Sequence, residues 1–383
     1  MLRLRIPLPR FVSAGEIYVG NGSLGALRAL DAARLAVLCS GSIMRDPELS
    51  RKVTSVANAH DLHLIEAPAG EPDLDKLMPV MARVAEIQPD WIVAIGGGSV
   101  LDAGKLLWIF YEHPDVELER IARPFALAPL RGKARFAAVP TTAGTGSEVS
   151  SSAILTDSSG QKIAIVSHDL LPDVVILDPT LTVGVPRATL AAAGLDALAH
   201  ALEGFASRFA NPLADTFAES AARTLFNRLT ETVNNPENLD TRLDVMQAAL
   251  MAGWVQNLKV PGVGHAIAHQ LGRFGVAHGA AAGALLAPAM GFNCGDGPTR
   301  RKYDRLGRAL GFEGAGELRD EVIRLRAALG AAASLETIVR GGRAALLSRM
   351  DEITRGALSD PCARANPRTV DGAAIRELLE AAC

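Results

Sequence analysis

The stretch WIVAIGGGSVLDAGK, residues 91–105, places an apolar run directly before three glycines and a helix-like segment. The run Trp91–Ile95 is typical of a buried strand, and the glycines allow a tight turn into a helix that begins near Ser99. Such a unit leaves backbone N–H groups and the positive end of the helix dipole open to a phosphate. A tight turn alone would also use glycines, and neither standard nucleotide fingerprint is present. The stretch predicts a β-α unit with a possible phosphate site.

Similar units repeat along the first half of the chain. Apolar runs that predict buried strands are Leu35–Cys39, Leu62–Ile65, Trp91–Ile95, Phe136–Val139 and Val174–Leu177. Helical stretches such as Asp73–Ile87 and Val100–Phe110 lie between them, and this alternation predicts a mostly parallel sheet covered on both faces. After Asp178-Pro179 the strand-like runs stop and Ala/Leu-rich helical periodicity continues to the end. We therefore expect an α/β dinucleotide-binding domain over residues 1–182 and an all-helical metal-binding domain over residues 183–383.

Composition excludes several classes of function. The chain has 383 residues, 21% of them charged, and a formal net charge of -3. This balance gives no basis for binding nucleic acid or an anionic membrane. The four cysteines are widely spaced and suggest neither a disulfide framework nor a thiolate metal site. Residues 1–11 lack the apolar core of a signal peptide, and we expect a cytoplasmic protein.

A second polar loop follows the expected strand at 136–139. It reads PTTAGTGSE over residues 140–148 and offers four hydroxyl side chains and two glycines. Such a loop can hydrogen-bond a ribose, a pyrophosphate or a carboxamide, or it can be a surface turn that caps a helix. Because ligands of open α/β sheets bind at the carboxyl ends of strands, two such loops favour a nucleotide site.

Potential metal ligands form two sets in the second half. Asp196 and His200 lie four residues apart, as do His265 and His269, and His278 follows. Residues four apart project from one face of a helix, so the two sets can face each other. One carboxylate and several imidazoles suit a divalent ion such as iron or zinc. The alternative is that Asp196–His200 is only a helix-surface pair.

Taken together, these segments resemble the iron-containing (group III) alcohol dehydrogenase family over nearly the whole chain. The segments that carry the resemblance are Gly96–Ser99 with Asp102 and Lys105, Pro140–Glu148, Asp178–Pro186, Asp196–His200 with Glu203, the histidines at 265, 269 and 278, and Asn366–Arg368. The resemblance implies an active site between an N-terminal dinucleotide-binding domain and a C-terminal helical domain. It also implies a homodimer, with iron as the expected metal and NAD or NADP as the cofactor. The ligand types alone would suit zinc as well.

Individual roles follow from the resemblance. It assigns the metal ligands to Asp196, His200, His265 and His278, and it places His269 near substrate and nicotinamide without making it a ligand. The positions that it assigns to the cofactor are Gly97, Gly98, Ser99, Asp102, Thr141, Thr142, Thr145, Ser147 and Lys162. A metal would stabilise the alkoxide while a hydride passes between the carbinol carbon and the nicotinamide. A free imidazole titrates near neutral pH, which suits His269 to proton relay.

Two departures from the family pattern bear on specificity. Ser40 stands where NAD-preferring members carry an Asp that holds the adenosine ribose, and Glu71 replaces a usual Asn. Loss of the carboxylate removes repulsion against a 2′-phosphate, so we expect NADP(H) to be accepted, with Ser40 at that site and Arg45 as a phosphate partner. Lys259 and Arg273 lie in stretches where small or apolar residues are frequent. They are either surface charges or the basis of a pocket for an anionic substrate.

The expected function is NAD(P)-linked interconversion of a small alcohol and aldehyde, either neutral or anionic. Trp254 is a candidate wall of the alcohol pocket or an ordinary core residue. A maleylacetate reductase of the same superfamily is an alternative function, and a dehydroquinate synthase-like lyase is a more distant one. Net consumption of NAD(P)H separates the lyase from both reductases.

Overall fold

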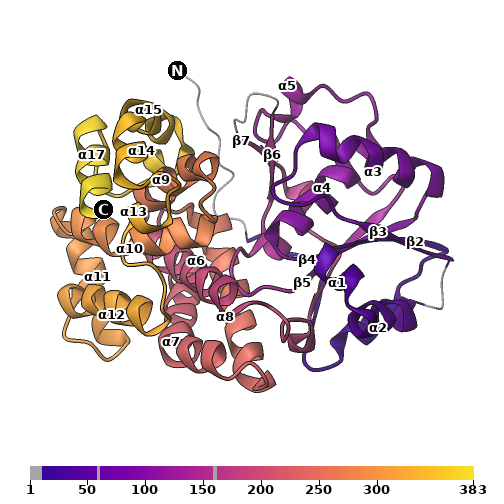
Figure 1. The fold of residues 1–383 in the computed structure, drawn as a ribbon, viewed down its shortest axis with the longest axis horizontal. Helices are drawn as coiled ribbons and strands as arrows, with labels where there is room; N and C mark the ends of the chain where they lie inside the picture. The colour runs from indigo at the N-terminus through magenta and orange to yellow at the C-terminus, as the bar shows by residue number, and fades with distance from the viewer. Residues whose placement is uncertain (1–10, 58–60, 158–161) are drawn as a thin grey trace.

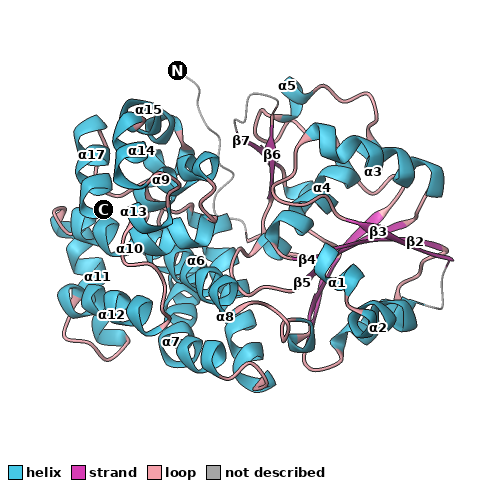
Figure 2. Cartoon of the chain, in the orientation of Figure 1, coloured by secondary structure: helices cyan, strands magenta, loops and turns pink. Residues whose placement is uncertain are grey.

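The computed structural model describes residues 11–57, 61–157 and 162–383. Strands gather at one end of the molecule and the remainder is helical (Figures 1 and 2). The predicted fold class, an α/β domain with a parallel sheet followed by a helical domain, is confirmed. The last strand ends at Leu177 and the first long helix of the second half begins at Arg187. Within the described residues, no helix is both long and apolar enough to cross a bilayer.

A six-stranded parallel sheet forms the centre of the first half. Its order is β1-β8-β5-β4-β2-β3. The strands are β1 (Glu16–Val19), β2 (Arg34–Cys39), β3 (Asp61–Glu66), β4 (Trp91–Gly96), β5 (Arg135–Pro140) and β8 (Val174–Leu177). A separate antiparallel hairpin consists of β6 (Ser152–Thr156) and β7 (Lys162–Val166). Neither β1 nor this hairpin was predicted from the sequence.

Alternation along the strands sends side chains to two separate cores. On β4, Ile92 and Ala94 pack with residues of helices α3 and α4, whereas Val93 and Ile95 pack on the other face with residues of α2. All six residues of β4 are buried, as expected of a strand covered on both sides. The helices of this half are α1 (Gly41–Arg45), α2 (Pro47–Ala57), α3 (Leu74–Ile87), α4 (Gly98–Glu112) and α5 (Leu118–Ile121).

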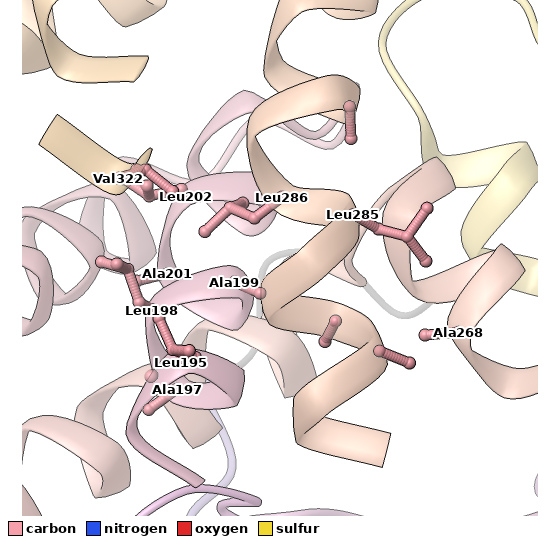
Figure 3. Packing of buried hydrophobic residues seen from close by; sticks show 14 of the residues in the cluster. Leu195, Ala197, Leu198, Ala199, Ala201, Leu202, Ala268, Leu285, Leu286 and Val322 are labelled. Carbon is pink, nitrogen blue, oxygen red and sulfur yellow. The ribbon is translucent and has the colours of Figure 1, made fainter. Parts of the chain in front are cut away.

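The second half is organised around one buried helix. Helix α6 (Arg187–Ala206) packs against α7, α8 and α10, and its residues from Gly194 to Ala206 are all buried. Figure 3 shows part of this core, where Leu286 of α10 points toward Leu202 of α6, whereas Leu285 projects from the opposite side of α10. The other helices are α7 (Pro212–Asn234), α8 (Leu239–Lys259), α9 (Val263–Leu271), α10 (His278–Asn293), α11 (Gly297–Ala309), α12 (Ala315–Ala328), α13 (Leu335–Ile338), α14 (Gly342–Ser348), α15 (Met350–Ser359), α16 (Pro361–Ala365) and α17 (Gly372–Ala381).

Glycines let α10 approach α6 closely where the site forms. A Cβ atom on Gly279 would lie 2.4 Å from the carbonyl oxygen of Ala192, and one on Gly283 would lie 2.9 Å from the Cβ of Leu195. Either contact is too short for a side chain to fit without movement. The small residues therefore allow the first turn of α10, which begins at His278, to lie directly beside Asp196.

Candidate metal and cofactor site

Three helices bring four potential metal ligands together. Asp196 and His200 come from α6, His265 from α9, and His278 from the first position of α10. One ligand atom of each lies within 4.8 Å of the others. The distances from Asp196 Oδ1 to the Nε2 atoms are 3.9 Å for His200, 3.6 Å for His265 and 3.3 Å for His278. The structure thus brings together the four residues that the family resemblance singles out.

These donors fit a divalent metal. A tetrahedral ion with ligands at about 2.1 Å holds those ligands about 3.4 Å apart, close to the three distances measured from Asp196. Asp196 Oδ1 and His265 Nε2 are buried, and neither has a hydrogen-bond partner among the described residues. Because buried polar atoms without a partner are costly, this arrangement indicates a site formed for a cation.

The carboxylates of the cluster favour positive charge, whereas burial opposes it. Burial opposes ionisation of Asp196, but the imidazoles of His200 and His278 outweigh it and hold the pKa of Asp196 well below its usual range. Burial lowers the pKa of His200 to about 3. Burial also acts to lower the pKa of His265, but the carboxylates of Asp196 and Glu203 outweigh it and raise this pKa to about 9. A divalent cation would satisfy the same carboxylate field.

Glu203 holds His265 in place. Its Oε2 lies 2.5 Å from His265 Nδ1 and also accepts the backbone N–H of His265 at 3.1 Å, while Oε1 accepts the N–H of Gly264 at 2.8 Å. The carboxylate therefore caps the start of α9 and turns Nε2 of His265 toward Asp196. Partners of this kind orient metal-ligating histidines. Sequence reasoning included Glu203 in the family motif but gave it no role.

His269 lies beside the cluster but outside the set of four. Its ring stacks on that of His278 with centroids 5.1 Å apart. Nδ1 of His269 lies 2.8 Å from Oδ2 of Asp360, a residue that sequence reasoning did not single out. Burial disfavours ionisation of Asp360, but the charge and hydrogen bond of His269 lower its pKa.

The two polar loops meet at the carboxyl ends of β4 and β5. Thr141 donates its N–H to the carbonyl of Gly96 at 2.9 Å. A Cβ on Gly98 would lie 2.6 Å from the side chain of Thr145, and one on Gly97 would lie 3.4 Å from Thr142. The glycine turn and the hydroxyl loop therefore form one continuous surface, and Ser99 lies in the first turn of α4 beside it.

Asp102 and Ser147 bond to each other. The Ser147 hydroxyl donates to Asp102 Oδ1 at 2.5 Å, and Oδ2 of Asp102 accepts the N–H of Ile154 at 3.1 Å. Lys105 is fully buried and donates to three carbonyls, that of Ser147 in the loop and those of Ser150 and Ser152 just after it. These bonds fix the hydroxyl loop against α4. Lys105 was included in the family motif without a role, and the structure shows that it holds the hydroxyl loop against α4.

Helix α8 joins the nucleotide loops to the helical half. Gln256 donates to the carbonyl of Thr145 at 2.6 Å. Asn257 accepts from the N–H and hydroxyl of Ser151 at 2.9 and 2.6 Å. Gly146 has φ +63° and lies so close to Gly253 that a Cβ on it would be 2.4 Å from the Gly253 Cα. Helix α8 therefore fixes the position of the hydroxyl loop relative to the helical half.

The residues expected at the adenosine end lie apart from the metal cluster. Ser40 and Ser42 share a hydrogen bond of 2.9 Å after β2, and Arg45 pairs with Glu66 at 3.3 Å. Lys162 on β7 pairs with Glu71 at 2.6 Å, and its Nζ would lie 3.2 Å from a Cβ on Gly272. The pair therefore bridges from the β6–β7 hairpin toward the end of α9.

The remaining candidate specificity residues have partners of their own. Lys259 is buried, donates to the carbonyl of Phe205 at 3.0 Å and pairs with Asp215. Arg273 pairs with Glu352. The Trp254 indole donates to Ser13 at 3.0 Å and packs against Phe11 and Phe217. Lys259 and Arg273 are therefore each paired with a carboxylate, and Trp254 is held by a hydroxyl and two aromatic rings.

Comparisons with known proteins match both halves of the chain. The model of the family described as iron-containing alcohol dehydrogenase matches residues 14–179, and that of the Fe-containing alcohol dehydrogenase family, C-terminal, matches residues 190–383. The 1-propanol dehydrogenase PduQ of Salmonella typhimurium is 32% identical over 95% of this chain and 97% of its own length. The NADPH-dependent butanol dehydrogenase of Clostridium saccharobutylicum is 29% identical over 98% and 97%. The structure of the iron-containing alcohol dehydrogenase of Thermococcus thioreducens superposes with a TM-score of 0.90 at 31% identity, covering 97% of this chain and 99% of that one.

Proposed function

Because the chain belongs to the iron-containing alcohol dehydrogenase family, we propose that Asp196, His200, His265 and His278 hold the metal of an NAD(P)-linked alcohol dehydrogenase. The single observation that carries this assignment is the convergence of their four ligand atoms within 4.8 Å. Iron(II) is the proposed ion, and zinc is chemically compatible with the same donors. Neither maleylacetate reduction nor a dehydroquinate synthase-like lyase reaction is supported by the relatives found.

Each part of the site has a distinct task. When bound, the metal polarises the substrate oxygen and the nicotinamide accepts or supplies the hydride. His269 holds or releases the proton of the substrate hydroxyl at Nε2, since its Nδ1 is engaged by Asp360. Glu203 and Asp360 keep the two α9 histidines in their orientations.

The cofactor occupies the surface formed by the two loops in this proposal. Backbone N–H groups at Gly97, Gly98 and Ser99 bind its pyrophosphate at the start of α4, where the helix dipole favours an anion. The hydroxyl loop contacts the ribose and carboxamide. The proposed contact residues on and around that loop are Asp102, Thr141, Thr142, Thr145, Ser147 and Lys162.

Cofactor preference and substrate class are finer proposals. With Ser40 in place of a carboxylate and Arg45 close by, NADP(H) is accepted at the adenosine end. Lys259 and Arg273 are both ion-paired, which removes the support for an anionic substrate. A small neutral alcohol or aldehyde is therefore proposed. A homodimer is proposed from the family resemblance, and a cytoplasmic location from the widely spaced cysteines.

One experiment tests the proposal directly. The protein is purified anaerobically, its metal content is measured, and a panel of neutral and acidic aldehydes is tested with NADH and NADPH. We expect net NAD(P)H consumption with neutral aldehydes, loss of activity after chelation and recovery with added iron(II) or zinc. Activity that survives complete metal removal, or an absence of NAD(P)H consumption with every aldehyde, contradicts the proposal.

A further inference from the structure

Helix α9 carries two histidines one turn apart, and each has a carboxylate on its Nδ1. Glu203 lies 2.5 Å from Nδ1 of His265, and Asp360 lies 2.8 Å from Nδ1 of His269. The two pairs differ in exposure, because the side chain of His265 is 2% exposed and that of His269 is 31% exposed. The same contact therefore serves a buried histidine aimed at Asp196 and a partly exposed one beside the cluster.

Asp360 is itself held from two sides. Its Oδ1 accepts the N–H of Cys362 at 2.8 Å, so that the residue caps the N-terminus of the short helix α16. The other end of α16 is fixed by Asn366, which is fully buried and accepts the N–H of Val263 at the start of α9. The segment 360–366 thus runs along α9 and is anchored at both ends. The Asp360 carboxylate has little freedom to leave His269.

The hydrogen bond between Asp360 and His269 determines which ring nitrogen of His269 carries the hydrogen. A carboxylate with two engaged oxygens only accepts, so Nδ1 of His269 must donate to Oδ2. In the neutral ring this leaves Nε2 with a lone pair. The ring lies face to face with His278, at an interplanar angle of 17°, and this fixes its orientation beside the ligand cluster.

We propose that Asp360 is a positioning residue that keeps His269 in the Nδ1–H form, ready to accept the hydroxyl proton of the alcohol at Nε2. This inference rests on the proposed function. In the oxidation, the carbinol carbon gives its hydride to NAD(P)+ and the hydroxyl proton passes to His269. The resulting imidazolium keeps its Nδ1–H bond to Asp360 and later releases the Nε2 proton to water. Asp360 remains ionised throughout.

A purely structural role as a helix cap is the competing explanation, and D360N separates the two. Asparagine caps helices as well as aspartate does, so its oxygen can keep the bond to the Cys362 N–H. Its NH2 group then faces His269 and donates to Nδ1, which forces the hydrogen onto Nε2. The cap survives and the tautomer is reversed. D360S is a second variant, because serine also caps but is too short to reach the ring.

The test combines kinetics with nitrogen NMR. We expect D360N and D360S to lower kcat about 10- to 100-fold, less than the about 100- to 10,000-fold that a general acid–base group contributes, because His269 itself is retained, with little change in KM or in Tm. Nitrogen-15 histidine spectra of the metal-free protein, with His269 assigned by comparison with H269Q, should show protonated Nδ1 in the wild type and protonated Nε2 in D360N. Asp371 caps α17 by accepting the N–H of Ala374, so D371N is the matched control and should change neither kcat nor the His269 signals.

The outcomes are distinguishable. Wild-type kcat and an unchanged His269 tautomer in D360N would overturn the positioning role. Wild-type protein without alcohol dehydrogenase activity would overturn the proposed function, while the NMR comparison would still decide whether Asp360 sets the tautomer. Asp360 would be assigned to helix capping only if D360A alone lowered Tm and both D360N and D360S kept wild-type kinetics.

Discussion

The metal end and the nucleotide end of this site are specified in different ways. At the metal end, buried side chains face one another, with Glu203 2.5 Å from Nδ1 of His265 and Nε2 of His265 3.6 Å from Asp196. At the nucleotide end, the geometry depends on absent side chains, since Gly98 leaves room for Thr145. Substitutions at the metal end should therefore act by removing a ligand or its charge, whereas substitutions at the nucleotide end should act by adding side-chain volume.

The largest effect should come from removing a proposed ligand. H265A removes Nε2 from the cluster and leaves the Glu203 carboxylate buried without its partner. We expect loss of bound metal and of more than about 99% of the activity, because removing a ligand should cost more than the about 10- to 100-fold that follows from altering only its outer partner. Metal analysis with steady-state kinetics checks this. H269Q is the contrast: it should keep the metal and lower kcat about 100-fold. Equal metal loss in both variants would contradict the division between ligand and relay.

A smaller effect at the same end should follow E203Q. The amide has the shape of the carboxylate, but it removes the negative charge from His265 and can direct an NH2 group at an N–H of α9. Because outer carboxylates tune metal affinity by about 10- to 100-fold, we expect that loss in affinity for zinc or iron(II). Competition with a chelator of known affinity measures it. Added metal should restore most of the activity, and unchanged affinity would mean that Glu203 serves only as a helix cap.

The first test of the nucleotide end is one added methyl group. G98A places a Cβ 2.6 Å from the Thr145 side chain and forces the two loops apart. Overpacking costs about 1–3 kcal/mol, so we expect the KM for the cofactor to rise about tenfold or more while the metal content stays that of the wild type. The control is G316A, at a glycine whose added Cβ meets nothing within 4 Å. A change in metal content with G98A would show that the two ends are not independent.

The contrast between the two ends also explains what sequence could predict. Asp196, His200 and Glu203 lie on one face of α6, so helical spacing alone is enough to group them. Four of the five predicted strands were recognisable as continuous apolar runs, as expected of buried strands, whereas β3 contains His63 and is only partly buried. Glycine runs, by contrast, occur in many turns, and the close approach of Gly98 to Thr145 is visible only once β4 and β5 are neighbours.

Other features depended on contacts between distant segments. Asp360 is 91 residues from His269, and the Asp-Pro pair at 360–361 signals a helix start but not a partner on α9. Strand β1 has four residues, none of them buried, and exists through its pairing with β8. The positions of Lys259 and Arg273 were equally non-local: each forms an ion pair with a residue more than 40 positions away. No local pattern encodes these contacts.

The smallest effect is expected at the adenosine end, where charges are exposed. Arg45 is paired with Glu66, and both side chains are more than half exposed, so solvent screens whatever they contribute. We expect R45A to reduce kcat/KM about fivefold with NADPH and to leave NADH unchanged, because only NADPH carries the 2′-phosphate. E66Q frees Arg45 from its partner and should shift the preference in the opposite direction, toward NADPH. Kinetics with both cofactors measure the ratio. If R45A lowered both values equally, Arg45 would support the fold of this edge and the cofactor preference would have to come from Ser40 and its neighbours.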